Sequence, residues 1–198
     1  MDKQYSREYF NQKAESWDRT PRSNGPHQLQ TLIKRLDINQ GAVVLDVGSG
    51  TGVFVPYIQA KVGKNGRIVC MDFAFNMLEI ARTKRKDHSI VQVCAEVETA
   101  GFCAGVFGAA VCYSTFPHFH DKPCALRRIY NLLQPGGKIF ICHSASRDFI
   151  NDIHRNIADF QDHLIPQYNE MFSLMEDAGY RNILIEESAD AYLVVGQK

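Results

Sequence analysis

The sequence lacks an excess of charge of either sign. Lys and Arg total 22 residues, Asp and Glu also total 22, and the formal net charge is zero. Proteins that bind DNA or RNA usually carry a basic patch or stripe that attracts the phosphate backbone. The composition therefore disfavours nucleic acid as a main partner.

Long apolar runs are also lacking, and the first ten residues, MDKQYSREYF, mix charged and aromatic side chains. Membrane-spanning helices need about 18 or more apolar residues, and secretory leaders need an apolar core. We therefore expect no membrane partner and a cytoplasmic location. The six cysteines form no C-x-x-C pair, and most of them lie in apolar segments, as reduced core thiols do.

The chain has 198 residues, of which 45% are hydrophobic and 22% are charged. This length and composition predict one globular domain over residues 1–198, with residues 1–40 as a helical lead-in. We find neither an internal repeat nor a linker.

Strand-like and helix-like segments alternate along the chain. We expect strands near 42–47, 67–72, 90–94, 106–113 and 138–142, and helices near 28–36, 52–60, 76–84, 122–133 and 167–178. A Pro135-Gly136-Gly137 stop is expected before the fifth strand. Two further segments, 181–187 and 192–195, are too close together for a parallel crossover. The pattern predicts an α/β fold, a Rossmann-like doubly wound seven-stranded sheet, mostly parallel, with a C-terminal antiparallel hairpin.

A glycine-rich turn, Gly48-Ser49-Gly50-Thr51-Gly52, follows the first strand. Glycines there let a ligand approach the backbone. The dinucleotide fingerprint G-x-G-x-x-G would need a glycine where Val53 stands, which disfavours a nicotinamide oxidoreductase, and no phosphate-binding G-x-x-x-x-G-K-S/T loop is present. Asp72, at the end of the second strand, is placed to accept hydrogen bonds from ribose hydroxyls. Together these features predict a nucleoside site.

Several landmarks in order resemble a known family. They are Tyr9-Phe10-Asn11-Gln12-Lys13-Ala14-Glu15-Ser16-Trp17-Asp18, the LDVGSGTG turn, Asp72 with Met77-Leu78 after it, and Leu132-Leu133-Gln134-Pro135-Gly136-Gly137-Lys138. Over roughly residues 9–143 the chain resembles the class I S-adenosylmethionine-dependent methyltransferases, especially the small-molecule enzymes of ubiquinone and menaquinone biosynthesis.

The resemblance implies roles for individual residues. Asp46, Gly48, Ser49 and Gly50 would border the methionine part of S-adenosylmethionine, Asp72 would hold the ribose, and Phe73 would lie against the adenine. The family usually has an Asp-Ala-Glu type segment after the third strand. Here Cys94-Ala95-Glu96 stands in its place, so Ala95 and Glu96 are the adenine candidates. Cys112, Tyr113 and Ser114 would face the sulfonium end, with Tyr113 a catalytic candidate. Tyr9 and Trp17 are assigned to the substrate side, with core packing as an equally weighted alternative.

Residues 144–166 are longer than a bare crossover needs, and we interpret them as a substrate lid. If residues 147–160 are helical, Ile150, Ile153 and Ile157 form an apolar stripe, and an adjacent polar stripe faces the pocket. That polar stripe consists of Arg147, Asn151 and His154, with surface pairing to Asp148 and Asp152 as the alternative for the arginine.

Three histidines lie around this segment: His143, His154 and His163. One of them could be a general base, for which His143 and His154 are the catalytic candidates and His163 a substrate-side residue. Alternatively they hold a metal, although their spacing fits no compact metal motif and no metal site is predicted. His118 and His120 are interpreted as packing residues.

The leading hypothesis is an enzyme that moves a methyl group from S-adenosylmethionine to a small-molecule acceptor by direct displacement. One alternative acceptor is a metalloid, thiol or metal-bound cofactor, reached through a His/Cys site. Another alternative is a non-catalytic module that only binds S-adenosylmethionine. A homodimer is left open.

Overall fold

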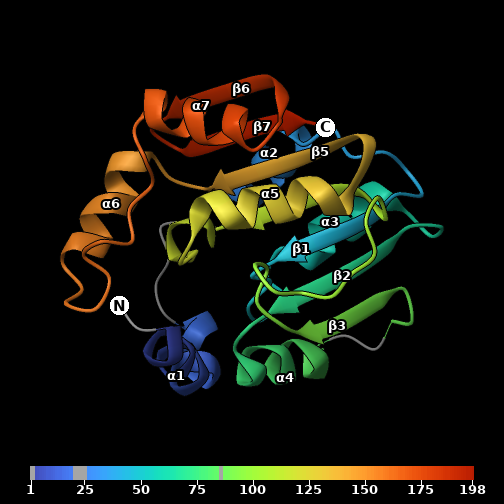
Figure 1. The fold of residues 1–198 in the computed structure, drawn as a ribbon. Coiled ribbons are helices and arrows are strands. Elements are labelled where there is room, and N and C mark those ends of the chain that lie inside the picture. The colour runs from blue at the N-terminus through green and yellow to red at the C-terminus, as the bar shows by residue number, and fades with distance from the viewer. Residues whose placement is uncertain (1–2, 20–25, 85–86) are drawn as a thin grey trace.

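The apolar segments form a single sheet with the strand order β3-β2-β1-β4-β5-β7-β6 (Figure 1). The computed structural model describes residues 3–19, 26–84 and 87–198. The parallel strands are β1 (Val43–Val47), β2 (Arg67–Asp72), β3 (Ile90–Cys94), β4 (Phe107–Tyr113) and β5 (Leu133–His143). β6 (Arg181–Ser188) and β7 (Ala191–Gln197) complete the sheet as an antiparallel hairpin, with β7 also antiparallel to β5. The predicted fold class is confirmed.

Helices cover both faces of the sheet, because its central strands are apolar on both sides. On β1, Val44 packs with α2 (Pro26–Arg35) and α3 (Val55–Val62), whereas its neighbour Leu45 packs with α5 (Lys122–Leu132) and α7 (Tyr168–Asp177). Successive side chains of a strand point to opposite faces, so one strand supplies both layers. α4 (Phe75–Lys84) follows β2. None of the described helices is long and apolar enough to cross a bilayer.

The fifth strand begins earlier than predicted, at Leu133, so Pro135, Gly136 and Gly137, expected as a stop before it, lie inside β5. The preceding helix, α5, does end before them, at Leu132. The C-terminal end of the chain pairs with them: Gly136 N–H donates to the Lys198 carbonyl over 3.0 Å, and Lys198 N–H donates to the Gly137 carbonyl over the same distance. The β4–β5 register shifts between Phe107 and Ala109, which accommodates the start of the strand. The extra length comes from pairing with a distant segment, which local sequence does not show.

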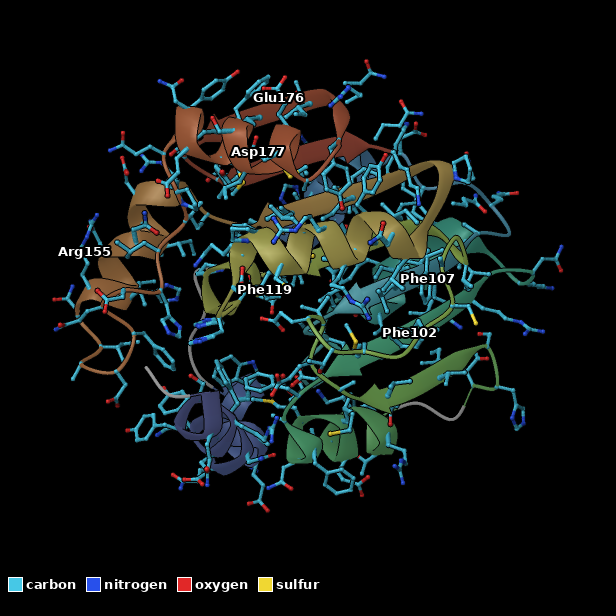
Figure 2. The ribbon with its side chains drawn as sticks, viewed as in Figure 1. Phe102, Phe107, Phe119, Arg155, Glu176 and Asp177 are labelled. Atoms are coloured by element: carbon cyan, nitrogen blue, oxygen red, sulfur yellow. The ribbon has the colours of Figure 1, made fainter. Side chains whose placement is uncertain are left out.

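The connection from β3 to β4 contains no helix among the described residues. Instead, Phe102 covers the start of β4: its ring lies 5.5 Å from that of Phe107 at 90° (Figure 2). A loop rather than a helix therefore follows Ala95 and Glu96, and the pocket next to them is bordered by irregular chain.

The N-terminal segment forms α1 (Lys3–Lys13) and η1, a 3-10 helix (Ala14–Arg19). α1 lies on the side of the molecule toward which the parallel strands point, as does α6 (Arg147–Arg155) (Figure 1). Asn11 joins α1 to α4, because its side-chain oxygen accepts from Asn76 N–H over 2.8 Å. Residues 1–2 and 20–25 of the predicted lead-in lie outside the described residues.

The predicted lid helix is shorter than expected, since α6 ends at Arg155 instead of continuing to Phe160. After α6 the chain turns so that Phe160 packs on the N-terminal segment, 4.8 Å from the ring of Tyr9 and 5.8 Å from that of Phe10. The Tyr5 hydroxyl also donates to Asp159 Oδ2 over 2.8 Å. The lid segment and α1 are therefore in direct contact.

Candidate functional site

Two adjoining pockets open at the carboxyl ends of β1, β2 and β4. This is the edge of a parallel α/β sheet where ligands usually bind. The pockets share five lining residues: Gly48, Asp72, Phe73, Thr115 and His118. The first continues along the β3 side, lined also by Ser6, Val47, Met71, Ala95, Glu96, Val97, Glu98, Phe119, His120 and His163. The second continues along the glycine turn, lined also by Phe10, Trp17, Ser49, Gly50, Thr51, Val53, Met77, Tyr113 and Ser114.

The glycine turn brings backbone close to the loop after β4. Gly48 has φ +65°, and a Cβ atom on it would lie 2.0 Å from Thr115 Oγ1. Gly50 also has a positive φ, +54°, but a Cβ atom there would meet nothing within 4 Å. Gly48 is thus required by both conformation and space, whereas Gly50 is required by conformation alone.

These two glycines give a matched pair of stability predictions. Gly50→Ala should cost about 1–2 kcal/mol of unfolding free energy, the usual cost of a left-handed alanine. Gly48→Ala should cost about 1–3 kcal/mol more, because Thr115 must move. Urea unfolding of the ligand-free protein measures both. Equal costs would contradict the Thr115 contact, and Thr115→Gly in the Gly48→Ala background should recover the excess.

Asp72 ends β2 with a carboxylate that the backbone holds in place. Its Oδ2 accepts from Gly50 N–H over 2.8 Å, and its Oδ1 accepts from Ala74 N–H over 2.8 Å. Burial raises the pKa of this carboxyl to about 6, and the backbone N–H groups oppose the rise. Each carboxylate oxygen can accept more than one hydrogen bond, and Asp72 lines both pockets, so it can also accept from a ligand there.

Asp46 lies behind the glycine turn and is 1% exposed. Burial, and then the charge of Asp72, raises its pKa to about 7. Among the described residues, Asp46 Oδ2 and the nearby turn hydroxyl Ser49 Oγ have no hydrogen-bond partner. Unpaired buried acceptors of this kind suit a ligand that brings a positive charge.

Asp46→Asn should stabilise the ligand-free protein in a pH-dependent way. Because burial raises the folded-state pKa, the folded protein binds more protons than the unfolded chain between about pH 4 and 7, so this group's contribution to stability falls as pH rises through that window. We expect the variant's melting temperature to exceed that of the parent by about 5–10 °C at pH 8, and by little at pH 5. Calorimetry at both pH values measures this, and an equal difference at the two would contradict the buried charge.

The first pocket has an aromatic face and an acidic edge. Phe73 follows Asp72 directly, and Ala95 N–H donates to the Asp72 carbonyl over 3.0 Å, so the ends of β2 and β3 are joined here. Glu96 also lines this pocket and forms an ion pair with Arg7 of α1. The N-terminal helix is therefore connected to the pocket wall that the sequence assigned to adenine.

Aromatic side chains from distant segments enclose the second pocket. Trp17 lies 5.4 Å from Phe10, ring to ring, and both line the pocket. Tyr113 stacks on Phe54 at 4.5 Å, and its hydroxyl lies 2.7 Å from Ser144 Oγ. Asp18 holds this end of the N-terminal segment, because it accepts from Thr51 Oγ1 over 2.7 Å and pairs with Lys84.

His118 lies between the two pockets and lines both. Its Nδ1 is 3.0 Å from Nδ1 of His163, and its ring is 4.9 Å from that of His154. Burial, followed by the neighbouring His154 and His163, lowers the pKa of His118 well below the usual range. Burial likewise lowers the pKa of His163 to about 4. At neutral pH both imidazoles are uncharged, and the pair has one acceptor nitrogen that is not used in the contact between the two rings.

Several predicted site residues do not reach the pockets. His143 is 2% exposed, and neither of its ring nitrogens has a partner among the described residues; burial lowers its pKa to about 3. Arg147 pairs with Asp148 at 2.8 Å and with Glu187 at 3.4 Å, as the surface alternative predicted. The others absent from the pocket linings are Tyr9, Asp46, Cys112, Asn151 and His154.

Sequence reasoning placed Gly48, Ser49, Gly50, Asp72, Phe73, Ala95, Glu96, Tyr113, Trp17 and His163 at the pockets, and the structure brings them together there. It missed Thr115 and Phe10 as lining residues, and the packing interpretation of His118 and His120 was incomplete, since both line a pocket. The sequence position of Thr115, His118 and His120, directly after β4 and at the same sheet edge as Asp72, could have indicated that they line the site. For Phe10 only tertiary packing carries the information.

The residues present fit a nucleoside that carries a cation. A carboxylate that lines both pockets stands beside an aromatic face, and a second buried carboxyl lies behind the turn. Among the described residues, no group of three or more His, Cys, Asp and Glu side chains is arranged to hold a metal ion.

Comparison with known proteins gives matches over most of the chain. Residues 45–141 match a family model described as a methyltransferase domain. Phosphoethanolamine N-methyltransferase 3 of Arabidopsis thaliana is 29% identical over 87% of this chain and 36% of its own length. The ubiquinone/menaquinone biosynthesis C-methyltransferase UbiE of Klebsiella pneumoniae is 25% identical over 81% of this chain and 76% of its own length. The chain thus spans about a third of the phosphoethanolamine enzymes it matches.

Solved structures share the fold. A methyltransferase of Haloferax volcanii, solved in complex with the Trm112 methyltransferase activator, superposes with a TM-score of 0.82 at 16% identity, covering 95% of this chain and 96% of that one. A SAM-dependent methyltransferase from Aquifex aeolicus superposes with a TM-score of 0.74 at 19% identity, covering 94% and 97%. At these identities the likeness concerns the fold.

Proposed function

Since this chain is a class I S-adenosylmethionine-dependent methyltransferase similar to UbiE, we propose that it methylates a small molecule whose reacting oxygen or nitrogen carries a proton at neutral pH. One observation supports this most directly: His118, an uncharged imidazole, lies at the junction of the two pockets. An imidazole at such a junction is placed to accept a proton from an acceptor.

The cofactor is S-adenosylmethionine, which supplies a methyl group activated by the positive sulfur. We propose that the Asp72 carboxylate accepts from the ribose hydroxyls and that Phe73, Ala95 and Glu96 border the adenine. The glycine turn and the buried charge of Asp46 would then receive the methionine part. These assignments keep the family's pattern, with Glu96 substituting for an aspartate that this chain lacks.

A small acceptor is favoured by how the site is enclosed. Trp17 and Phe10 from the N-terminal segment line the second pocket, and His163 from the lid segment lines the first. Because the aromatic contacts of Phe160 join these two segments, a large acceptor would have to separate them. Residues 144–166 would thus act as the lid, and the enclosed site would exclude water from the reaction.

A screen of acceptor classes tests the proposal. Phenols, primary and secondary amines and thiols are each incubated with the protein and S-adenosylmethionine, and S-adenosylhomocysteine is measured. Turnover of a phenol or an amine is the expected result. Turnover of thiols alone would contradict the need for a base, and binding of S-adenosylmethionine without any turnover would identify a non-catalytic module.

A further inference from the structure

Resting on the proposed function, we infer that His118 and His163 form a proton relay that carries the acceptor's proton from the pocket toward solvent. His118 is more than a single base because its Nδ1 lies within hydrogen-bond distance of a second imidazole, 3.0 Å from Nδ1 of His163. A hydrogen bond between two such nitrogens requires one ring to donate and the other to accept. Hence at most one of these Nδ1 atoms carries the bridging proton in the neutral pair.

The surroundings keep both rings neutral before reaction. Burial lowers the pKa of both rings. At His118 the neighbouring His154 of α6, His143 of β5 and Lys122 of α5 lower the pKa further. At His163 the charge of Asp162 opposes the lowering of the pKa. Lys122 Nζ donates to the Pro117 carbonyl over 3.2 Å. Burial lowers the pKa of Lys122, and the charge of Glu170 of α7 opposes this. A neutral pair can take up one proton, whereas two imidazolium rings at this distance would repel each other.

The lid holds His163 in position by backbone contacts. Asn151 is 2% exposed, and its side chain accepts from Ile165 N–H over 2.8 Å and donates to the Ile165 carbonyl over 3.0 Å. His154 Nδ1 contacts the His163 carbonyl, and because a carbonyl only accepts, this nitrogen carries a proton. Asn151, which sequence reasoning assigned to the substrate, and His154, which it made a catalytic candidate, are therefore positioning residues for His163.

The proposed relay gives the proton one path. His118 begins with its proton on Nδ1, donated to His163 Nδ1, so its Nε2 is the nitrogen free to act in the pocket. When the acceptor's O–H or N–H bond breaks, the proton forms a new bond to His118 Nε2, and the bond pair remains on the acceptor. The Nδ1 proton of His118 then passes to His163 Nδ1, and His163 releases its Nε2 proton to water. One proton leaves the acceptor and one reaches solvent.

Variants of His163 separate a relay from simple support. His163→Gln retains a hydrogen-bond acceptor for His118 but cannot pass a proton on, and His163→Phe retains only the ring volume. We expect both variants to lower kcat roughly 10- to 100-fold. This loss is smaller than the 10²–10⁴-fold loss that follows removal of a general base, because His118 remains. Added imidazole should restore part of the lost activity. Full kcat in His163→Gln would overturn the relay. His88→Gln, the same change at an exposed turn, is the matched control.

A measurement on the cofactor-free protein tests the relay independently of the proposed function. Long-range ¹H–¹⁵N spectra of the imidazoles should show neutral His118 protonated on Nδ1 and neutral His163 protonated on Nε2, with His154 protonated on Nδ1. Protonation of His118 on Nε2 would overturn the relay even if the enzyme is active. If no acceptor is turned over, the proposed function fails, while this result still decides whether the pair has the geometry described.

Discussion

Replacing His118 with alanine is expected to lower kcat by about 10²–10⁴-fold for an acceptor that must lose a proton, which is the usual contribution of a positioned base. The side chain lines both pockets and has a lowered pKa, so at neutral pH it has a lone pair at the point where acceptor and cofactor would meet. Initial rates of S-adenosylhomocysteine formation at saturating substrates measure the loss.

The acceptor itself provides the control for this variant. An acceptor that is already deprotonated, such as a thiolate, needs no base, so His118→Ala should leave its rate much less changed. A uniform loss on both acceptor types would mean that His118 shapes the pocket without taking a proton. Calorimetry should also show S-adenosylmethionine affinity within a few-fold of the parent, because the proposed ribose and methionine contacts are elsewhere.

Replacing Asp72 with alanine should weaken S-adenosylmethionine binding by about 1–3 kcal/mol, which corresponds to roughly 5- to 150-fold in Kd. The substitution would remove the acceptor of two ribose hydroxyls and leave the N–H groups of Gly50 and Ala74 without their partner. Asp72→Asn, which retains the shape of the side chain and loses its charge, should bind S-adenosylmethionine with an affinity between those of the parent and of Asp72→Ala. Titration calorimetry at pH 8 measures all three proteins.

The pH dependence of binding gives this prediction a second readout. Burial raises the pKa of Asp72 to about 6, so the carboxylate is ionised above that pH and is protonated below it. Affinity for S-adenosylmethionine in the parent should therefore fall as the pH is lowered through 6, and Asp72→Asn should lose less. Asp87→Ala, at an exposed aspartate that binds Ser89, is the control, and a matching loss there would contradict the assignment.

The parts of the fold that depend on local sequence were predicted well. The first strand is apolar on both faces, and Gly48 and Asp72 stand where a strand ends, so their position followed from the order of elements. The predicted fold is confirmed by the sheet order and by the antiparallel pairing of β6 and β7. Alternating strands and helices leave few topologies available, which explains the success.

The parts of the site that depend on distant contacts were not predicted. His143 stands at a strand end, as a site residue would, yet it is buried away from both pockets. His163 lies beside His118 in a lid segment whose backbone is bound by Asn151 and His154. Phe10 enters the pocket because aromatic rings from both ends of the site pack together. Sequence spacing carries no information about such contacts.

The N-terminal segment contacts the sheet edge and the lid through polar side chains as well as aromatic ones. The N-terminal segment is connected to the sheet edge by the pairs Arg7–Glu96 and Asp18–Lys84 and to the lid by Tyr5–Asp159. Exposed ion pairs are each worth little, typically 0.2–1 kcal/mol. These polar pairs therefore contribute little, and the buried contact between Phe10 and Phe160 does most to hold the segment against the lid.

The proposed function requires S-adenosylmethionine to bind at the ends of β1 and β2, with its sulfur directed toward His118. A crystal structure with S-adenosylhomocysteine bound tests this most directly. We expect both ribose hydroxyls on the Asp72 carboxylate, the adenine along Phe73, and the sulfur on the side of the pocket junction that His118 lines. Density for the ligand elsewhere, or a sulfur atom facing away from His118, would show that the cofactor does not bind in this way.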